Sequence, residues 1–162
     1  MSGTAMKAIA RAHAEGIKIS LDLGDPFVVE HFRAPVEEVI EKYASLIFMN
    51  REEGRALLGG SVDDQLDALA KRVDTVVLKL GAEGSLVRRG DQTVRIQAPR
   101  VDAVDTTGAG DSYAGGFLYG ISRGWDLERC GKLASEVAAL TVSQVGGVVR
   151  DASVLAEALK RV

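Results

Sequence analysis

The sequence has few of the residues and patterns that mark several classes of protein. A single cysteine, Cys130, is present among 162 residues, so no intrachain disulfide can form, and the reducing cytoplasm is the natural compartment. No apolar run approaches the roughly 20 residues that span a bilayer, and Met1 to Arg11 lacks the apolar stretch of a signal peptide. We therefore expect a cytoplasmic protein that has no membrane partner.

Basic residues are not in excess either. The 20 Lys and Arg residues face 23 Asp and Glu residues, which gives a net charge of -3 and a pI near 5.4. A chain without an excess of positive charge is not expected to bind nucleic acid. The length, with 46% hydrophobic and 27% charged residues, is typical of one compact domain. We expect residues 1–162 to form a single domain.

Segments typical of strands and of helices alternate along the first half of the chain. Strands are expected at 17–21, 46–49 and 75–80, and helices at 5–14, 36–43, 52–58 and 62–72. A hairpin is expected at 84–89 and 93–98, and mostly helix after Gly108. Parallel strands need crossover connections that are usually helical, so the pattern predicts an α/β, Rossmann-like fold with a largely parallel sheet flanked by helices.

Three candidate motifs fall at or just past the ends of expected strands. They begin at Asn50, at Gly81 and at the turn near Gly108. In open α/β sheets, ligands bind outside the carboxyl ends of the strands. We therefore expect the three motifs to converge on one edge of the sheet.

Small residues open a helix in the run Thr107–Ser112. The first amides of a helix lack intrahelical partners and its dipole adds positive charge, so this start can bind an anion. Gly108 and Gly110 let the backbone approach a phosphate, and Ala109 intrudes little more. Asp111 does not help anion binding, so it favours a role in taking a proton from an attacking hydroxyl. The simpler alternative is an ordinary glycine-rich helix start with Asp in the favoured first turn.

A rival interpretation uses the same residues. Gly108 to Ala114 also fits the loose dinucleotide pattern G-x-G-x-x-G/A. That pattern requires a strong buried strand directly before the glycines, and the segment Val101–Thr106 is too polar to supply one. Asp111 would also lie near the pyrophosphate. The dinucleotide interpretation is therefore disfavoured.

Two further segments suit the parts of a bound nucleotide. Asn50 and Glu53 begin a helix and share one helical face, where they could hold hydrated Mg²⁺, although Asn50 alone is more often an N-cap. The run Lys79–Gly84 is a strand followed by a glycine-bounded turn, which lets backbone pass close to a base or ribose. Taken alone, this run is an ordinary entry to a hairpin.

In this order the segments resemble the ribokinase-like (PfkB) family of carbohydrate and nucleoside kinases. The run Asp105-Thr106-Thr107-Gly108-Ala109-Gly110-Asp111 matches the carboxyl-terminal signature of that family, and Asn50 with Glu53 fits its N-x-x-E motif. The segment 144–147 is similar to the family's loop beside the nucleotide. The segments 21–27 and 117–120 resemble the adenosine-kinase-like branch.

The resemblance implies ATP-dependent transfer of a phosphoryl group to a hydroxymethyl group of a sugar or nucleoside. Asp111 would be the catalytic base, and the amides of Gly108, Ala109 and Gly110 would stabilise charge on the γ-phosphate. Asn50 and Glu53 would organise Mg²⁺ through its waters. The residues implied to lie near the nucleotide are Asn50, Lys79, Leu80, Gly81, Ala82, Glu83, Gly84, Gly110 and Ser135.

Two implied details concern cations. Asp105 and the Thr107 carbonyl would help to bind a monovalent cation such as K⁺, as in some relatives. Lys79 departs from the hydroxyl residue that the family often has at this position. Its ammonium could reach the phosphates, or it could pair with an acid at the surface.

The resemblance also implies that a large part of the family fold is missing. Members are roughly twice this length, and the absent amino-terminal part carries the substrate pocket and a small β-sheet lid. The sheet should then have an uncovered edge, which invites a second copy or a complementary chain. The alternative to an enzyme is a noncatalytic nucleotide-binding or assembly module with an idle kinase signature, and the simplest alternative is a structural α/β fragment.

Overall fold

The computed structural model describes residues 3–162, whose contacts divide the chain into two compact units. Unit 1 is residues 3–79 together with 88–93, and unit 2 is residues 80–87 together with 94–162. The sequence predicts a single domain. No helix within residues 3–162 is long and apolar enough to cross a membrane.

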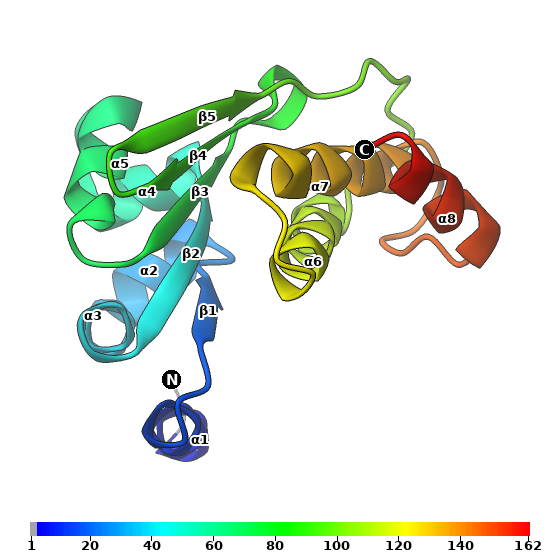
Figure 1. Ribbon diagram of the computed structural model, residues 1–162. Coiled ribbons are helices and arrows are strands. Elements are labelled where there is room, and N and C mark those ends of the chain that lie inside the picture. The colour runs from blue at the N-terminus through cyan, green and yellow to red at the C-terminus, as the bar shows by residue number, and fades with distance from the viewer. Residues whose placement is uncertain (1–2) are drawn as a thin grey trace. The chain divides into compact units, whose positions relative to one another are not determined.

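Five strands form one sheet in the order β1-β2-β3-β4-β5 (Figure 1). The strands are β1 (Ile19–Asp22), β2 (Ala44–Asn50), β3 (Thr75–Lys79), β4 (Ser85–Arg89) and β5 (Gln92–Ile96). The pairs β1–β2 and β2–β3 are parallel. Strands β4 and β5 flank a two-residue turn, which joins antiparallel strands and makes the sheet mixed. The predicted α/β fold is thus confirmed.

Unit 1 contains five helices among its described residues. They are α1 (Gly3–Ala14), α2 (Pro26–His31), α3 (Arg33–Lys42), α4 (Arg51–Leu58) and α5 (Val62–Ala70). Strands β2 and β3 are buried along most of their length and are apolar, as expected for parallel strands covered by helices. The core side chains include Ile47, Phe48, Met49, Val76, Val77 and Leu78 from the strands and Val39, Leu57, Leu66 and Leu69 from the helices.

Helix α2 is the element of unit 1 that the sequence does not predict. Asp25 caps it by accepting a hydrogen bond from the amide of Phe27 at 2.7 Å, and Pro26 occupies its first turn. A helix of six residues is too short to display a periodic apolar pattern. Its cap, rather than its periodicity, is the signal that the sequence carried.

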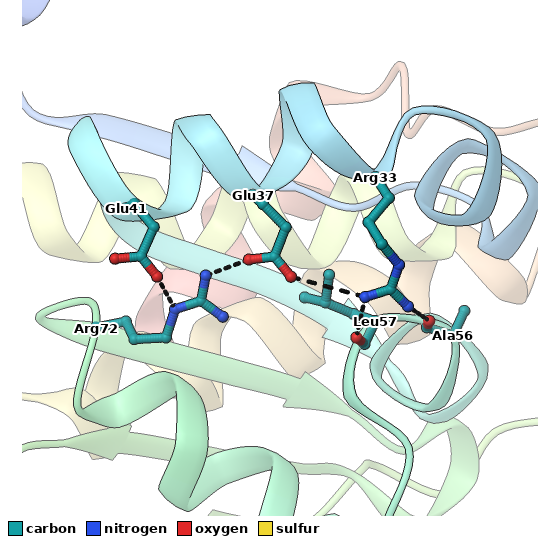
Figure 2. Close-up of polar contacts among 6 residues, drawn as sticks. All are labelled: Arg33, Glu37, Glu41, Ala56, Leu57 and Arg72. Atoms are coloured by element: carbon teal, nitrogen blue, oxygen red, sulfur yellow. Dashed lines mark hydrogen bonds and ion pairs between the residues drawn. The ribbon is translucent and has the colours of Figure 1, made fainter.

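A network of charged side chains joins three segments of unit 1, as Figure 2 shows. Arg72 pairs with Glu37, and its Nε lies 2.6 Å from a carboxylate oxygen of Glu41. Arg33 lies 3.7 Å from Glu37 and donates to the carbonyl oxygens of the last turn of α4, at 2.8 Å to Leu57 and at 2.7 Å to Ala56. These carbonyls have no partner within the helix, so Arg33 fixes the end of α4.

Unit 2 is built around two helices that pack very closely (Figure 1), α6 (Ala109–Ser122) and α7 (Leu127–Val142). A Cβ atom on Gly116 would lie 2.9 Å from the Cα of Ala134, and one on Gly120 would lie 2.7 Å from the Sγ of Cys130. The two glycines therefore allow the close approach of the helices. The unit also contains the 3₁₀ turn η1 (Gly81–Glu83) and helix α8 (Ala152–Lys160).

Candidate functional site

Three polar residues end the three parallel strands of unit 1. Asp22 is the last residue of β1, Asn50 of β2 and Lys79 of β3. In the sheet Asn50 lies opposite Lys79, and Asp22 lies opposite Phe48. Because the strands are parallel, these ends share one edge, where α/β sheets bind ligands.

Asn50 and Glu53 form a capping box at the start of α4. The side-chain oxygen of Asn50 accepts from the Glu53 amide at 2.9 Å. In return, the carboxylate of Glu53 accepts from the backbone amide of Asn50 at 2.8 Å and from its Nδ2 at 2.6 Å. Each Glu53 oxygen is thus held by Asn50, which gives the carboxylate one defined orientation.

The Glu53 carboxylate is nearly buried, since the residue is only 2% exposed. Burial raises the pKa of Glu53, and the hydrogen bond from the Asn50 backbone and the charge of Lys79 oppose that effect. The charges of Asp22 and Asp25 add to the rise, and the net pKa lies above the ordinary value. The sequence places Glu53 correctly on the same helical face as Asn50 but does not indicate its burial.

Lys79 pairs with Asp22, an acid that the sequence motifs do not indicate as part of the site. The Nζ of Lys79 lies 2.7 Å from Oδ2 of Asp22, and the side chains are 15% and 27% exposed. The two residues lie on strands that are not adjacent, so the pairing follows from the strand order. The signal in the sequence is only that both residues follow apolar strands.

The donors of the Asn50–Glu53 pair fit a contact to hydrated Mg²⁺ better than a direct metal cage. Among the described residues, no group of three or more His, Cys, Asp and Glu side chains could hold a metal ion. The carboxylate of Glu53 is ordered by Asn50 and retains lone pairs that can accept from metal-bound water. Such an arrangement suits an ion that arrives with most of its own ligands.

In unit 2, the glycine-rich run forms the start of α6. Gly108 precedes the helix with a φ of 72°, a left-handed conformation that favours glycine, and its carbonyl accepts from the Ser112 amide at 2.9 Å. The Ala109 amide makes a 3.3 Å hydrogen bond to the carbonyl of Thr106. Asp111 lies in the first turn and is exposed. The first turn of α6 therefore has an exposed carboxylate next to backbone that small side chains leave accessible.

Asp105 connects the loop before α6 to the loop after α7. One carboxylate oxygen accepts from the Thr107 amide at 2.9 Å, and the other accepts from the Gly146 amide at 3.0 Å. The hydrogen bond from Thr107 and then that from Gly146 lower the pKa of Asp105. The structure therefore places the predicted loop 144–147 beside the glycine-rich run.

The other predicted nucleotide residues of unit 2 lie at and after the strand-to-hairpin turn. Gly81, Ala82 and Glu83 form η1 and are exposed, and the amide of Leu80 donates to the carbonyl of Gly84 at 2.8 Å. Gly84 has a φ of 90°, and a Cβ there would lie 1.9 Å from the Ile96 carbonyl oxygen, so this turn requires glycine. Ser135 lies on α7 and is only 5% exposed.

Of the predicted residues, Asn50, Glu53 and Lys79 thus lie in unit 1 and the others lie in unit 2. Comparison with known proteins adds a further finding. Residues 2–151 match the sequence profile of the pfkB family carbohydrate kinases. A nucleoside kinase of Methanocaldococcus jannaschii is 32% identical over 145 residues, which are 87% of this chain and 46% of that protein.

Solved structures agree with this match. The adenosine kinase of Sinorhizobium meliloti has a TM-score of 0.90 and 35% identity, over 96% of this chain and 48% of that one. A fructokinase of Vibrio cholerae, solved with fructose, ADP and a calcium ion, has a TM-score of 0.84 and 28% identity, over 96% of this chain and 55% of that one. The chain therefore spans about half the length of these relatives.

The fold is that of the ribokinase-like kinases. The chain belongs to the pfkB family of carbohydrate kinases.

Proposed function

We propose that this chain carries the nucleotide-binding and catalytic half of an ATP-dependent phosphotransferase whose acceptor is a hydroxymethyl group of a sugar or nucleoside. The observation that carries the proposal is the start of α6, where the left-handed Gly108 leads into a helix whose first turn exposes Asp111. Backbone amides at a helix start bind phosphate, whereas a carboxylate there hinders mere binding. A carboxylate beside a phosphate site is useful when a proton must be removed.

In the proposed mechanism, Asp111 accepts the proton of the acceptor hydroxyl. The freed oxygen attacks the γ-phosphorus, the bond to the β-γ bridging oxygen breaks, and ADP leaves with the negative charge of that oxygen. The amides of Gly108, Ala109 and Gly110 stabilise the charge on the γ-phosphate oxygens. The Ala109 amide exchanges its long bond to Thr106 for the phosphate.

The remaining predicted residues are assigned to the nucleotide and its cations. Leu80, Gly81, Ala82, Glu83, Gly84 and Ser135 are proposed to lie near the nucleotide. When bound, Mg²⁺ neutralises phosphate charge, and Asn50 and Glu53 orient its waters through the carboxylate that Asn50 already holds. Asp105 and the Thr107 carbonyl are the proposed contacts of K⁺. The lowered pKa of Asp105 keeps its carboxylate charged for this role.

Further polypeptide is proposed to complete the acceptor site. The chain spans about half the length of its relatives, and β1, a strand of four residues, lies at the end of the strand order. None of the residues of α1, which precedes β1, is buried. We assign this edge to a second copy or a complementary chain, because an edge strand offers free backbone groups for pairing. The single, buried Cys130 supports a cytoplasmic location.

The test is to titrate the purified chain with ATP and then to measure ADP production with sugars and nucleosides as acceptors. Turnover that falls by roughly 10² to 10⁴ in Asp111→Asn, with little change in ATP affinity, supports the proposal. Asp102→Asn is the matched control, because it removes an exposed carboxylate that lies outside the helix start. Turnover that survives in Asp111→Asn excludes Asp111 as the base.

The half-length of the chain favours one alternative, a noncatalytic nucleotide-binding or assembly module. That alternative predicts ATP binding and no ADP production in either form. A chain that binds no ATP at all would be a structural fragment.

A further inference from the structure

The ion pair between Lys79 and Asp22 passes over the middle strand of the parallel sheet in unit 1. Lys79 lies opposite Asn50 on β2, and Asp22 lies opposite Phe48 on the same strand. Side chains two residues apart on a strand share one face, so all four residues are on the same face of the sheet. The 2.7 Å contact therefore ties β1 to β3 across the end of β2.

Asp22 also shapes the turn that leads from β1 into α2. Its Oδ1 accepts from the amide of Gly24 at 3.2 Å, while its Oδ2 accepts from Lys79. Three residues after Asp22, Asp25 caps α2, which packs against α4. The carboxylate of Asp22 is thus shared between the ion pair and the turn that supports a neighbour of α4.

The Asn50–Glu53 pair adjoins both the Lys79–Asp22 ion pair and the contact between α2 and α4. Asn50 is opposite Lys79 in the sheet, and Glu53 stands in the first turn of α4, against which α2 packs. Lys79 is the positive charge that acts on the Glu53 carboxylate, and Asp22 and Asp25 are the negative charges that act on it. Loss of Lys79 would leave the carboxylates of Asp22, Asp25 and Glu53 together without the positive charge that acts on Glu53.

We propose that the Lys79–Asp22 ion pair is a positioning device for Asn50 and Glu53, holding the carboxyl ends of β1, β2 and β3 together so that the capping box keeps the orientation that receives Mg²⁺-bound water. Lys79 is then a positioning residue and not a phosphate ligand. The inference rests on the proposed function for the identity of the ion, since Mg²⁺ enters with ATP.

An ion pair that only stabilises the fold would lower the free energy of unfolding when removed and leave the capping box unchanged in the folded chain. A positioning pair also changes the capping box itself. The side-chain amide of Asn50 provides a direct spectroscopic readout, because its Nδ2 donates a hydrogen bond to Oε1 of Glu53, 2.6 Å away. The gain in ATP affinity when Mg²⁺ is added provides the second readout.

The experiment compares wild type with Lys79→Met, Asp22→Asn and the double variant. Asp22→Asn keeps an oxygen for Gly24 and removes only the charge, so it decides the question if Lys79→Met fails to fold. We expect the Asn50 side-chain amide signals to shift and to exchange faster with solvent in each variant. We also expect the gain in ATP affinity on adding Mg²⁺ to fall roughly 10-fold or more, while ATP affinity in EDTA stays unchanged. The double variant should lose little beyond either single variant.

Arg88→Met is the matched control. It breaks the ion pair of Arg88 and Asp67, another contact of unit 1, with 2.6 Å between the partners and side-chain exposures of 26% and 54%. This variant should leave both readouts as in wild type.

The inference is overturned if the Asn50 signals and the Mg²⁺ gain are unchanged in the variants. It is also overturned if Lys79→Met alone weakens ATP binding in EDTA, because Lys79 would then contact the phosphates directly. If the wild-type chain binds no ATP, the proposed function fails, and the Asn50 signals still decide the positioning role.

Discussion

A Cβ atom on Gly108 would lie 2.3 Å from the carbonyl oxygen of Gly147 and 2.7 Å from its Cα. The start of α6 and the loop after α7 therefore touch through backbone alone. Asp105 binds the same loop through the amide of Gly146. Two glycines and one acid thus fix the surroundings of the glycine-rich run within unit 2.

Gly108→Ala should destabilise unit 2 and abolish ATP binding. The substitution places a side chain at a φ of 72° and against backbone that cannot move aside, which costs roughly 1–3 kcal/mol for the backbone conformation alone. Trp125 is the only tryptophan and lies in unit 2, so its fluorescence during urea unfolding measures the loss. Gly115→Ala is the control. It lies in the same helix with nothing within 4 Å of its Cβ, and it should be neutral or stabilising.

Asp105→Asn should remove part of the acid dependence of the stability of unit 2. The amides of Thr107 and Gly146 lower the pKa of the folded carboxyl, so its stabilisation is complete above the pKa of the unfolded chain. That stabilisation is lost as the pH falls through the folded pKa. Urea unfolding across the acidic range should show a shallower pH slope in Asp105→Asn and a lower stability at neutral pH. An equal slope in Asp105→Asn and wild type would contradict this prediction, and the exposed Asp102→Asn is the control.

Tyr113→Phe should remove a loss of stability at alkaline pH. Burial raises the pKa of Tyr113 to about 12, against the opposing hydrogen bond from Ser85, so the folded state holds the phenol proton more tightly than the unfolded chain does. The stabilisation is full below the ordinary tyrosine pKa of about 10 and is lost as the pH rises through the folded pKa.

The measurement for Tyr113 is the free energy of unfolding between roughly pH 9 and pH 12. At neutral pH the Phe variant should lose about 1 kcal/mol, because the hydroxyl of Ser85, which lies 2.7 Å from the phenol oxygen in the wild type, loses its partner. Ser85→Ala removes the other half of this contact and keeps the titrating phenol. A Phe variant as sensitive to alkali as the wild type would rule out this account.

Arg33→Met should loosen the carboxyl-terminal turn of α4. The guanidinium group holds the carbonyls of Ala56 and Leu57, and Figure 2 shows that Glu37 links it to Arg72. Because the Arg33 side chain is 52% exposed, we expect a loss of only about 1 kcal/mol. Amide hydrogen exchange in α4 measures it, since unit 1 has no tryptophan. Lys42→Met breaks an exposed pair with Glu38 and should have almost no effect.

Much of the fold follows from patterns that neighbouring residues create. The apolar run at 75–80 predicts β3 to within one residue, because a strand covered on both faces needs β-branched and apolar side chains throughout. Asn50 and Glu53 are three residues apart, which places them on one face of a helix wherever that helix lies. The glycines of the run 107–112 likewise predict a helix start, since the requirement for glycine is local.

The partners of these residues depend on the strand order and the loop contacts, which no local pattern contains. Lys79 and Asp22 are 57 positions apart and meet because β1 and β3 flank the same strand. Gly147 lies against Gly108 because α6 and α7 pack together. The sequence alone therefore determined the strands and the starts of α4 and α6, because these depend on interactions between residues near in the chain. Its motifs also determined the family. Only the tertiary structure decided the burial of Glu53 and the choice of Asp22 as the partner of Lys79, because burial and charge pairing depend on distant segments packed together.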